Sequence, residues 1–340
     1  MNTKFLFPDD DGINEASSIL KNGGLVGLPT ETVYGLAADA LNPLAVNNIF
    51  KAKGRPNDNP LIVHIANFES LFPLVLEVPE KAKILSNLFW PGPLTMIFKK
   101  SNLVPMVTSG NLDTVAIRMP DHPVAKAVIE TSKLCLAAPS ANISGSPSPT
   151  SAKHVLNDLN GKIDAVIDGG NSSIGLESTV ITFENDYIKL LRPGFITVEQ
   201  LENAVGKVLV DDAVLNGLKD NSTVSSPGMK YKHYAPKANV IIVKANSSSF
   251  INFINNHNNH STLALCYEED KPYLNTKTLV MGKKDDYQSQ ARLLFSLLRD
   301  IDIDEDIKTV YARCPKPVGL GLALYNRLIR ASGFEVIELD

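Results

Sequence analysis

Three hydroxyl groups recur at every second position of residues 29–36, which read Pro-Thr-Glu-Thr-Val-Tyr-Gly-Leu. If this segment is extended, Thr30, Thr32 and Tyr34 point to the same side, because successive side chains of a strand alternate between its faces. Such a polar face can line a site for a small molecule. A half-exposed edge strand is the other interpretation, and this segment alone leaves both open.

A cluster of cations follows in residues 51–60, which read Lys-Ala-Lys-Gly-Arg-Pro-Asn-Asp-Asn-Pro. Lys51, Lys53 and Arg55 fall where a predicted helix ends, and cations at a helix C-terminus also complement its dipole. Three cations followed by two prolines and two asparagines exceed that role, and Arg and Lys are the side chains that bind phosphate. The segment therefore predicts a polyphosphate site. His64 lies in the next apolar strand, where a core histidine is the favoured interpretation.

Isolated polar residues stand on or beside later strands. Arg118 interrupts an apolar strand, and a buried arginine needs an anionic partner, either a ligand carboxylate or the nearby Asp121. Residues 137–150 form a loop of Ser, Pro and small residues between a strand and a helix, where backbone amides and the helix N-terminus favour an anion. A flexible Ser-Pro loop is the alternative. Ser178 and Arg192 each stand at the end of a predicted strand.

Alternating helices and strands must position these residues. They are predicted from the spacing of the apolar residues, which follows the helical period in some segments and the strand period in others. The predicted helices are residues 13–22, 43–52, 123–131, 151–159, 197–205, 250–255, 287–299 and 320–331. The predicted strands are residues 25–28, 61–65, 94–98, 115–119, 134–138, 165–167, 179–183, 188–191, 240–243, 263–266, 278–281 and 310–312.

This order predicts an α/β domain over residues 1–208, a linker over 209–238 and a second α/β domain over 239–340. Two domains also suit a chain of 340 residues, because a single core stops growing at roughly 250–300 residues. Within the linker, residues 226–236 hold lysines, a histidine and two tyrosines between two prolines, more than a passive spacer needs.

The composition limits the classes of protein. Hydrophobic residues make up 44% and charged residues 21%, and the net charge of −4 gives no general attraction to nucleic acid. The apolar runs are strand-sized, and the N-terminus has no basic and apolar leader. The three cysteines lack the spacing of a metal or redox motif. We therefore expect a cytoplasmic protein with no membrane span and no metal held by fixed protein ligands.

Seven motifs carry a resemblance to a known family: PTETVYGL, KAKGRPNDNPLIVHI, FWPGPLT, AIRMPDHP, APSANISGSPSPTSA, GLESTVI and LRPG. In this order and spacing the chain resembles the threonylcarbamoyl-AMP synthases of the YrdC-like fold. The segment SPGMKYKHYAPKA and the region after it resemble the long, two-domain form of that family. The resemblance implies a twisted, open mixed sheet with helices, followed by a smaller Rossmann-like α/β domain.

The resemblance also implies a reaction. L-threonine, bicarbonate or CO2, and ATP with Mg2+ give threonylcarbamoyl-AMP and pyrophosphate, a nucleotidyltransferase reaction. A separate tRNA threonylcarbamoyl transferase then uses the product to form threonylcarbamoyladenosine in tRNA. Such chemistry depends on positioning and charge neutralisation more than on a nucleophile of the protein.

By their positions in the motifs, two sets of residues are implied to bind the substrates. The implied threonine site consists of Thr32, His64, Arg118, Ala138 and Ser178, with Arg118 on the carboxylate. The implied ATP site consists of Lys53, Arg55, Asn59, Thr114, Ser140, Asn142, Ser148, Arg192 and Tyr234, with Lys53 and Arg55 as catalytic cations and Tyr234 as a lid residue.

Other functions remain open on the residues alone. A local basic patch can make an RNA-binding module without catalysis, although the net charge predicts that direct RNA binding is weak. A carbamoyl-transfer maturation factor is expected to carry cysteine-rich zinc motifs, which three scattered cysteines do not form. A soluble α/β protein with purely structural polar loops is the third alternative.

Overall fold

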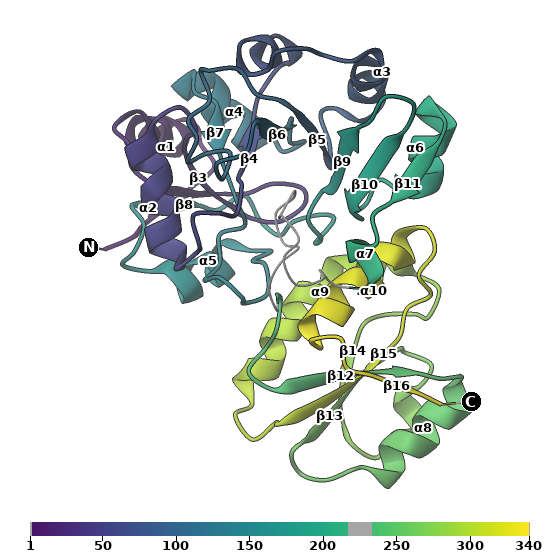
Figure 1. Cartoon of the computed structure of the whole chain (residues 1–340). Helices are drawn as coiled ribbons and strands as arrows, with labels where there is room; N and C mark the ends of the chain where they lie inside the picture. Colours follow the sequence, from purple (N-terminus) through teal and green to yellow (C-terminus); the bar gives the residue numbers. More distant parts are fainter. Residues whose placement is uncertain (1, 217–232, 340) are drawn as a thin grey trace.

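The computed structural model describes residues 2–216 and 233–339, and their strands form two separate sheets (Figure 1). The first sheet has eleven strands in the order β1-β8-β2-β3-β7-β4-β6-β5-β9-β10-β11. Its pairs are mixed; for example, β2 runs antiparallel to β3 but parallel to β8. The second sheet has five strands in the order β14-β13-β15-β12-β16, all paired in parallel. The predicted combination of a mixed sheet and a smaller Rossmann-like sheet is confirmed.

The first part of the chain contains the elements that surround the first sheet. Its strands are β1 (Lys4–Leu6), β2 (Val26–Leu28), β3 (Gly35–Asp39), β4 (Ile62–His64), β5 (Leu94–Lys99), β6 (Thr114–Arg118), β7 (Leu136–Ala137), β8 (Ala165–Ile167), β9 (Thr179–Phe183), β10 (Ile188–Arg192) and β11 (Val208–Val210). Its helices are α1 (Asp10–Lys21), α2 (Pro43–Lys53), η1 (Phe68–Leu74), α3 (Glu80–Phe89), α4 (Pro123–Ser132), α5 (Ala152–Leu159), α6 (Val198–Val205) and α7 (Ala213–Asn216).

The second part holds the elements around the smaller sheet. Its strands are β12 (Asn239–Lys244), β13 (Thr262–Cys266), β14 (Lys277–Val280), β15 (Thr309–Arg313) and β16 (Val336–Glu338). Its helices are α8 (Ser247–Asn256), η2 (Lys271–Tyr273), α9 (Tyr287–Asp300), η3 (Ile301–Ile303) and α10 (Leu320–Ala331). None of the helices in residues 2–216 and 233–339 is both long and apolar enough to cross a membrane.

Local sequence signals explain where the helices begin and end. Asn42 caps α2 by accepting hydrogen bonds from the amides of Leu44 and Ala45, and Pro43 takes the first helical position, where its missing N–H costs nothing. Gly54 ends α2 in the left-handed conformation, with φ of 62°. At α6, Thr197 and Gln200 form the predicted capping box.

Every helix and strand predicted from the sequence is present, but the sequence interpretation missed several elements. Strand β3 has the sequence Gly-Leu-Ala-Ala-Asp, without a β-branched or aromatic residue, so propensity does not reveal it. Its pairing with β2 and β7 on either side decides its conformation. Strands β1, β11 and β16 have only three residues each and lie at the edges of the sheets. Helix α3 buries Ala82, Leu85 and Ser86 on one side, a helical spacing that the interpretation overlooked.

The segment predicted as a linker, residues 209–238, begins with regular structure. Strand β11 extends the first sheet to Val210, and α7 follows it. Residues 217–232 of the predicted linker lie outside the described residues. His233 and Tyr234 are described and are both buried.

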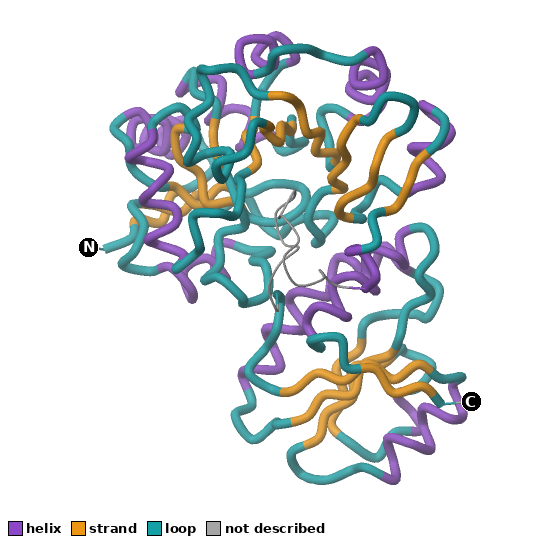
Figure 2. The backbone as a smooth tube through the Cα atoms, in the orientation of Figure 1, coloured by secondary structure: helices purple, strands orange, loops and turns teal. Residues whose placement is uncertain are grey.

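The two sheets are joined through helices α9 and α10 (Figure 2). These helices cover the face of the smaller sheet that is turned toward the first sheet, and α8 covers the other face (Figure 1). Leu322 of α10 packs in the core of the first part, while Val33 and Leu176 of the first part pack in the core around α9. Gly175 shows how close the approach is, because a Cβ there would lie 2.6 Å from the Cα of Arg292 in α9.

Candidate active site

A cavity opens where loops from both ends of the first sheet converge beside α9 and α10. The loop between β2 and β3, the end of α2, the ends of β4, β6 and β10, and the loop after β7 all contribute to its wall. Among the residues predicted from the sequence, its lining includes Thr32, Lys53, Arg55, His64, Arg118, Ala138, Ser140, Asn142, Ser178, Arg192 and Tyr234. The structure thus brings together residues that are up to 202 positions apart in the chain, from Thr32 to Tyr234.

Arg118 is buried, and each part of its guanidinium has a partner. Its Nη1 donates to Thr32 Oγ1 at 2.8 Å, and its Nε donates to the carbonyl of Gly92 at 3.2 Å. Its Nη2 forms an ion pair with Glu31 Oε1 at 2.5 Å. The alternative protein partner named from the sequence, Asp121, was wrong, because the carboxylate that reaches Arg118 belongs to the motif around Thr32.

His64 lies beside Arg118 in the register of the two parallel strands β4 and β6. Burial lowers the pKa of His64 well below its usual value, and the neighbouring Arg118 charge lowers it further. The imidazole is therefore neutral at neutral pH, so it can accept or donate a hydrogen bond without adding charge. Tyr34 does not join these residues, contrary to the expectation for an extended segment, because residues 31–33 form a bend. Its hydroxyl donates instead to the carbonyl of Gly170 at 2.7 Å.

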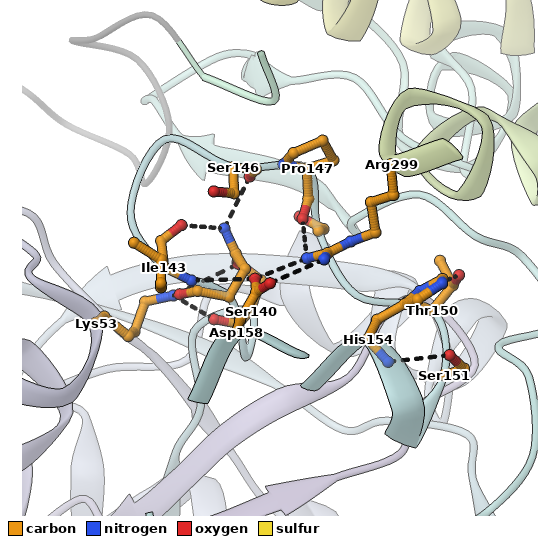
Figure 3. Close-up of polar contacts among 12 residues, drawn as sticks. Lys53, Ser140, Ile143, Ser146, Pro147, Thr150, Ser151, His154, Asp158 and Arg299 are labelled. Carbon is orange, nitrogen blue, oxygen red and sulfur yellow. Dashed lines mark hydrogen bonds and ion pairs between the residues drawn. The ribbon is translucent and has the colours of Figure 1, made fainter. Parts of the chain in front are cut away.

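Lys53 points into the loop after β7 (Figure 3). Its Nζ donates to the carbonyls of Ser140 and Asn142, the latter at 2.6 Å, and lies 3.5 Å from Asn142 Oδ1. The Asn142 amide in turn donates to the carbonyls of Ile143 at 2.9 Å and Ser146 at 2.8 Å. Burial, followed by the charge of Arg55, lowers the pKa of Lys53 well below its usual value. Lys53 therefore fixes the shape of this loop.

Arg55 and Arg192 bring further positive charge to the cavity. Burial lowers the pKa of each guanidinium to about 10, and each is also affected by other nearby charges. Arg55 Nη2 donates to the carbonyl of Pro60 at 3.3 Å, whereas its Nε has no hydrogen-bond partner among the described residues. Arg192 is buried and Arg55 is half-buried, and a desolvated cation with a spare donor, such as Arg55, is poised to bind an anion.

Ser178 connects Arg192 to the other side of the cavity. Arg192 donates from Nε to the Ser178 carbonyl and from Nη2 to Ser178 Oγ, both at 3.1 Å. Ser178 Oγ also lies 2.7 Å from Thr95 Oγ1, and Thr95 pairs with Arg118 across β5 and β6. Gly194 is required here, since a Cβ on it would lie 2.7 Å from the carbonyl carbon of Ser178. Ser178 thus lies between the Arg118 group and the Arg192 group.

Three residues implied for ATP do not line the cavity in this structure. Ser148 is fully buried and donates to Glu177 Oε1 at 2.5 Å. Asn59 is buried, and its Oδ1 has no hydrogen-bond partner in residues 2–216 or 233–339. Thr114 lies at the opposite end of β6 from Arg118, roughly 13 Å away along the strand.

The C-terminal part of the chain supplies contacts that the sequence interpretation missed. Arg299 of α9 donates to both oxygens of Asp158, at 3.0 and 2.8 Å, and to the carbonyl of Pro147 at 2.5 Å (Figure 3). Because Asp158 also accepts from the amide of Ile143 at 3.3 Å, Arg299 fixes the same loop as Lys53 from its other side. No sequence signal distinguished Arg299 from the other charged residues of an amphipathic helix.

Tyr234 is held against this interface. Its ring lies 5.1 Å from the ring of Phe295 and 6.0 Å from the guanidinium of Arg327, measured to the ring centroids. The following residue, Ala235, donates its amide to the carbonyl of Gly145 at 3.1 Å. Tyr234 therefore covers the cavity at the point where α9, α10 and the loop after β7 meet.

Two carboxylates near the cavity were also missed, although both lie inside motifs that the sequence analysis singled out. Glu31 pairs with Arg118, and Glu177 lines the cavity beside Arg192. A charged residue directly beside hydroxyl residues, as in Thr-Glu-Thr and Glu-Ser-Thr, was the available signal. Within the described parts of the chain, no group of three or more His, Cys, Asp or Glu side chains is arranged to hold a metal ion.

Two family models match the chain, and they cover most of it. Residues 18–194 match a family described as telomere recombination, and residues 196–333 match the C-terminal domain of threonylcarbamoyl-AMP synthase. A threonylcarbamoyl-AMP synthase of Pyrococcus abyssi is 46% identical over 96% of each chain. One of Bacillus subtilis is 45% identical over 99% of this chain and 97% of its own.

Solved structures give the same result for the fold. The crystal structure of Pyrococcus abyssi Sua5 complexed with L-threonine is 43% identical and superposes with a TM-score of 0.91 over the whole of both chains. A variant of that protein, with an adjacent histidine and tyrosine replaced by alanine, gives a TM-score of 0.93 at 42% identity, covering 99% of this chain and 98% of the variant.

Proposed function

The chain belongs to the threonylcarbamoyl-AMP synthase family, and from this premise we propose how its own residues carry out the synthesis. The substrates in this proposal are L-threonine, bicarbonate or CO2, and ATP, and the products are threonylcarbamoyl-AMP and pyrophosphate. The observation that supports it most directly is the cavity, in which Lys53 at the end of α2, Arg55 in the loop after it, Arg118 of β6 and Arg192 of β10 converge. Such a concentration of buried cations suits two anionic substrates, an amino-acid carboxylate and a triphosphate.

We assign L-threonine to the end of the cavity formed by Thr32, His64 and Arg118. Arg118 can bind the carboxylate, provided that the carboxylate shares the guanidinium with Glu31 or displaces it. Neutral His64 and the hydroxyl of Thr32 supply hydrogen bonds for the amine or hydroxyl of threonine. The structure of Pyrococcus abyssi Sua5 with L-threonine supports this choice of amino acid.

We assign ATP to the other end, where Arg55 and Arg192 face the loop that Lys53 shapes. The guanidinium groups provide several donors for phosphate oxygens. The loop at Ser140 and Asn142 also lines this end of the cavity, so that its backbone can approach the phosphate groups closely. Tyr234 lies over this end, so we propose that it covers the nucleotide. Since the described residues offer no cage of acidic ligands, Mg2+ would be held mainly by the triphosphate and water, where it neutralises phosphate charge.

The two substrates would meet near Ser178, which contacts both sides of the cavity. In the proposed reaction the threonine amine adds to CO2 and loses a proton, which gives an N-carboxylated threonine. One carboxylate oxygen then forms a bond to the α-phosphorus, and the bond from that phosphorus to the α,β-bridging oxygen breaks. Pyrophosphate leaves with that oxygen and its electron pair. Arg192 is placed to stabilise the charge on the phosphorus oxygens during this nucleotidyl transfer.

We further propose that the product passes to a separate tRNA threonylcarbamoyl transferase. A mixed anhydride of a carbamate and a phosphate reacts readily with water, so its release must be matched to use by that partner. The acidic net charge of −4 gives no reason for this chain itself to bind tRNA tightly.

Pyrophosphate release tests the proposal. The full chain is incubated with ATP and Mg2+, with and without L-threonine and bicarbonate, and the adenylylated product is identified by mass spectrometry. We expect release only when both co-substrates are present. Release that does not need threonine would point to a different acceptor, and the absence of release from folded protein would overturn the proposal.

A further inference from the structure

The largest fully buried side chain among the described residues belongs to Arg327 of α10, at the junction of the two sheets. It is fully buried and comes from the C-terminal part, yet its hydrogen bonds, apart from one to the neighbouring Asn326, go to the first part. Its Nε donates to Glu177 Oε2 at 2.8 Å, its Nη1 to the Pro193 carbonyl at 2.6 Å and its Nη2 to the Glu177 carbonyl at 3.2 Å. Arg327 therefore reaches out of its own domain.

Glu177 is the link between Arg327 and the cavity. Its Oε2 accepts from Arg327 and its Oε1 accepts from Ser148. Glu177 also belongs to the lining of the cavity, and its carboxylate is close enough to Arg192 to be affected by that charge. Burial by itself would raise the pKa of Glu177, but the charges of Arg327 and Arg192 outweigh it, and the net pKa is lowered. The carboxylate is consequently charged at neutral pH.

A charged carboxylate at this place poses an electrostatic problem for the proposed ATP site. The triphosphate would lie beside Arg192, and Glu177 faces the same cavity, so two negative groups would repel each other at low dielectric. Arg327 supplies the compensating charge at Glu177 Oε2, the oxygen that Ser148 does not contact. It also fixes both ends of the residue, through the side chain and the main-chain carbonyl.

We propose that Arg327 is a positioning residue of the ATP site, supplied by the C-terminal domain, which holds Glu177 against Ser148 and cancels its charge beside the triphosphate. The proposal rests on the function proposed above and deepens it, because it makes the C-terminal domain part of the unit that binds ATP. Arg327 does not touch ATP and acts only through Glu177.

The test measures binding of α,β-methylene-ATP, which cannot be cleaved at the reacting bond, to the full chain by calorimetry. For R327M we expect Kd to rise at least about tenfold, because Glu177 keeps its charge without compensation. For E177Q we expect Kd equal to or lower than that of the wild type. For the double variant E177Q/R327M we expect Kd within about threefold of the wild type, because both charges are gone. KM for threonine, measured by pyrophosphate release, should stay within about twofold in all three.

Arg313 and Asp270 provide a matched control, since they form a buried ion pair that lies wholly within the C-terminal domain and does not line the cavity. The pair of substitutions D270N/R313M should leave Kd for the analogue unchanged. If R327M does not fold, the E177Q background serves the same purpose. In that background, adding R327M should change Kd by less than about threefold, and a tenfold loss there would show that Arg327 acts without Glu177.

Three results would overturn the proposal. The first is a folded R327M variant whose Kd for the analogue equals that of the wild type. The second is a double variant whose Kd is as high as that of R327M. The third is an E177Q variant with the highest Kd of all, which is the result expected if Glu177 held the metal of MgATP instead. Pyrophosphate release by the wild type is measured in parallel. A wild type that binds the analogue but makes no product would count against the proposed function and not against the role of Arg327.

Discussion

Two regions of this molecule that contain buried arginines differ in the balance between the cations and their protein partners. The first is the cavity of the mixed sheet, and the second is a crevice at the carboxyl ends of β12 and β15 in the parallel sheet, lined by Arg313. The crevice lies where the chain leaves neighbouring strands for opposite faces, the usual place for a ligand in such a fold.

Arg313 in the crevice is nevertheless completely satisfied. It donates to both oxygens of Asp270, at 2.8 and 2.5 Å, and to the carbonyls of Ala245 and Asn246. Its guanidinium also lies over the ring of Phe250, 4.1 Å from the centroid. This ion pair fixes the packing of its own domain. It differs from the Arg118–Glu31 pair, whose arginine lines a cavity together with three further cations.

The cavity of the mixed sheet contains more positive than negative charge. Its lining includes four cations, Lys53, Arg55, Arg118 and Arg192, whereas Glu177 is the one carboxylate among the described lining residues, and Arg327 already takes part of its charge. Outside the lining, Glu31 pairs with Arg118, and the charges of Asp58 and Asp158 act on Arg55 and Lys53. The comparison shows that burial of an arginine does not mark a ligand site. An excess of buried cations over their protein partners does, because the protein leaves a charge for the substrate to neutralise.

The largest expected effect comes from removing part of that excess. Arg55→Ala and Lys53→Ala should each lower turnover by on the order of a hundredfold, since loss of one preorganised charge contact costs roughly 3 kcal/mol in the transition state. The cause of the lower turnover should differ between the two variants. Arg55→Ala removes a spare donor for the substrate, whereas Lys53→Ala removes the side chain that shapes the loop at Ser140 and Asn142. Pyrophosphate release under saturating substrates measures the loss. Near-normal turnover in folded protein would remove the assignment.

A smaller effect is expected from the C-terminal helix that supports the loop. Arg299→Met should raise KM for ATP by about tenfold, because Asp158 and the Pro147 carbonyl lose their shared donor and the loop is no longer fixed. Arg292→Met is the matched control: Arg292 lies on the same helix and donates to the Ser173 carbonyl, but it is exposed. Equal changes in the two variants would mean that the loss is one of general stability.

The free energy of unfolding should also depend on pH, because two buried histidines, His64 and His233, line the cavity. Burial, followed by nearby positive charge, lowers the pKa of His64 well below its usual value and that of His233 to about 4, whereas an unfolded histidine titrates near 6.5. The unfolded chain therefore binds more protons below pH 6.5. The contribution of these neutral histidines is complete above that pH and is lost as the pH falls toward 4, at up to about 1.4 kcal/mol per unit for each histidine.

Urea unfolding at pH 7, 6 and 5 measures this slope, and the variant His64→Gln/His233→Gln should reduce it. The share of His122 and His154 remains, because burial lowers the pKa of those side chains as well. An unchanged slope in the variant would assign the effect to other groups. The crevice offers a contrast, because no histidine appears among the described residues that line it.

The smallest expected effect on turnover belongs to the satisfied arginine. Arg313→Met should leave turnover per folded molecule within about twofold of the wild type, while it lowers the free energy of unfolding by about 3–5 kcal/mol, since Asp270 is left buried without its partner. Pyrophosphate release and urea unfolding on the same sample give both numbers. A large loss of turnover at normal folded fraction would contradict the distinction between the two regions.

The sequence by itself determined the local elements and the chemical groups of the site. Helix α2 was predictable because Asn42, Pro43 and Gly54 act on neighbouring backbone groups, and α6 because of its capping box. The motif residues identified the family, and eleven of the residues implied for the two substrates do line one cavity. Strand β3 was missed because its conformation depends on its two neighbours in the sheet and not on its own residues.

Only the tertiary structure decided which groups are paired. Glu31 rather than Asp121 reaches Arg118, Tyr34 turns away to Gly170, and Lys53 is directed to backbone carbonyls. Arg327 contacts Glu177 across 150 positions in the chain. Caps and periodicity act over a few residues and can be read from the sequence, whereas a charge pair between distant segments exists only after both domains have packed, and its energy depends on the burial that packing creates.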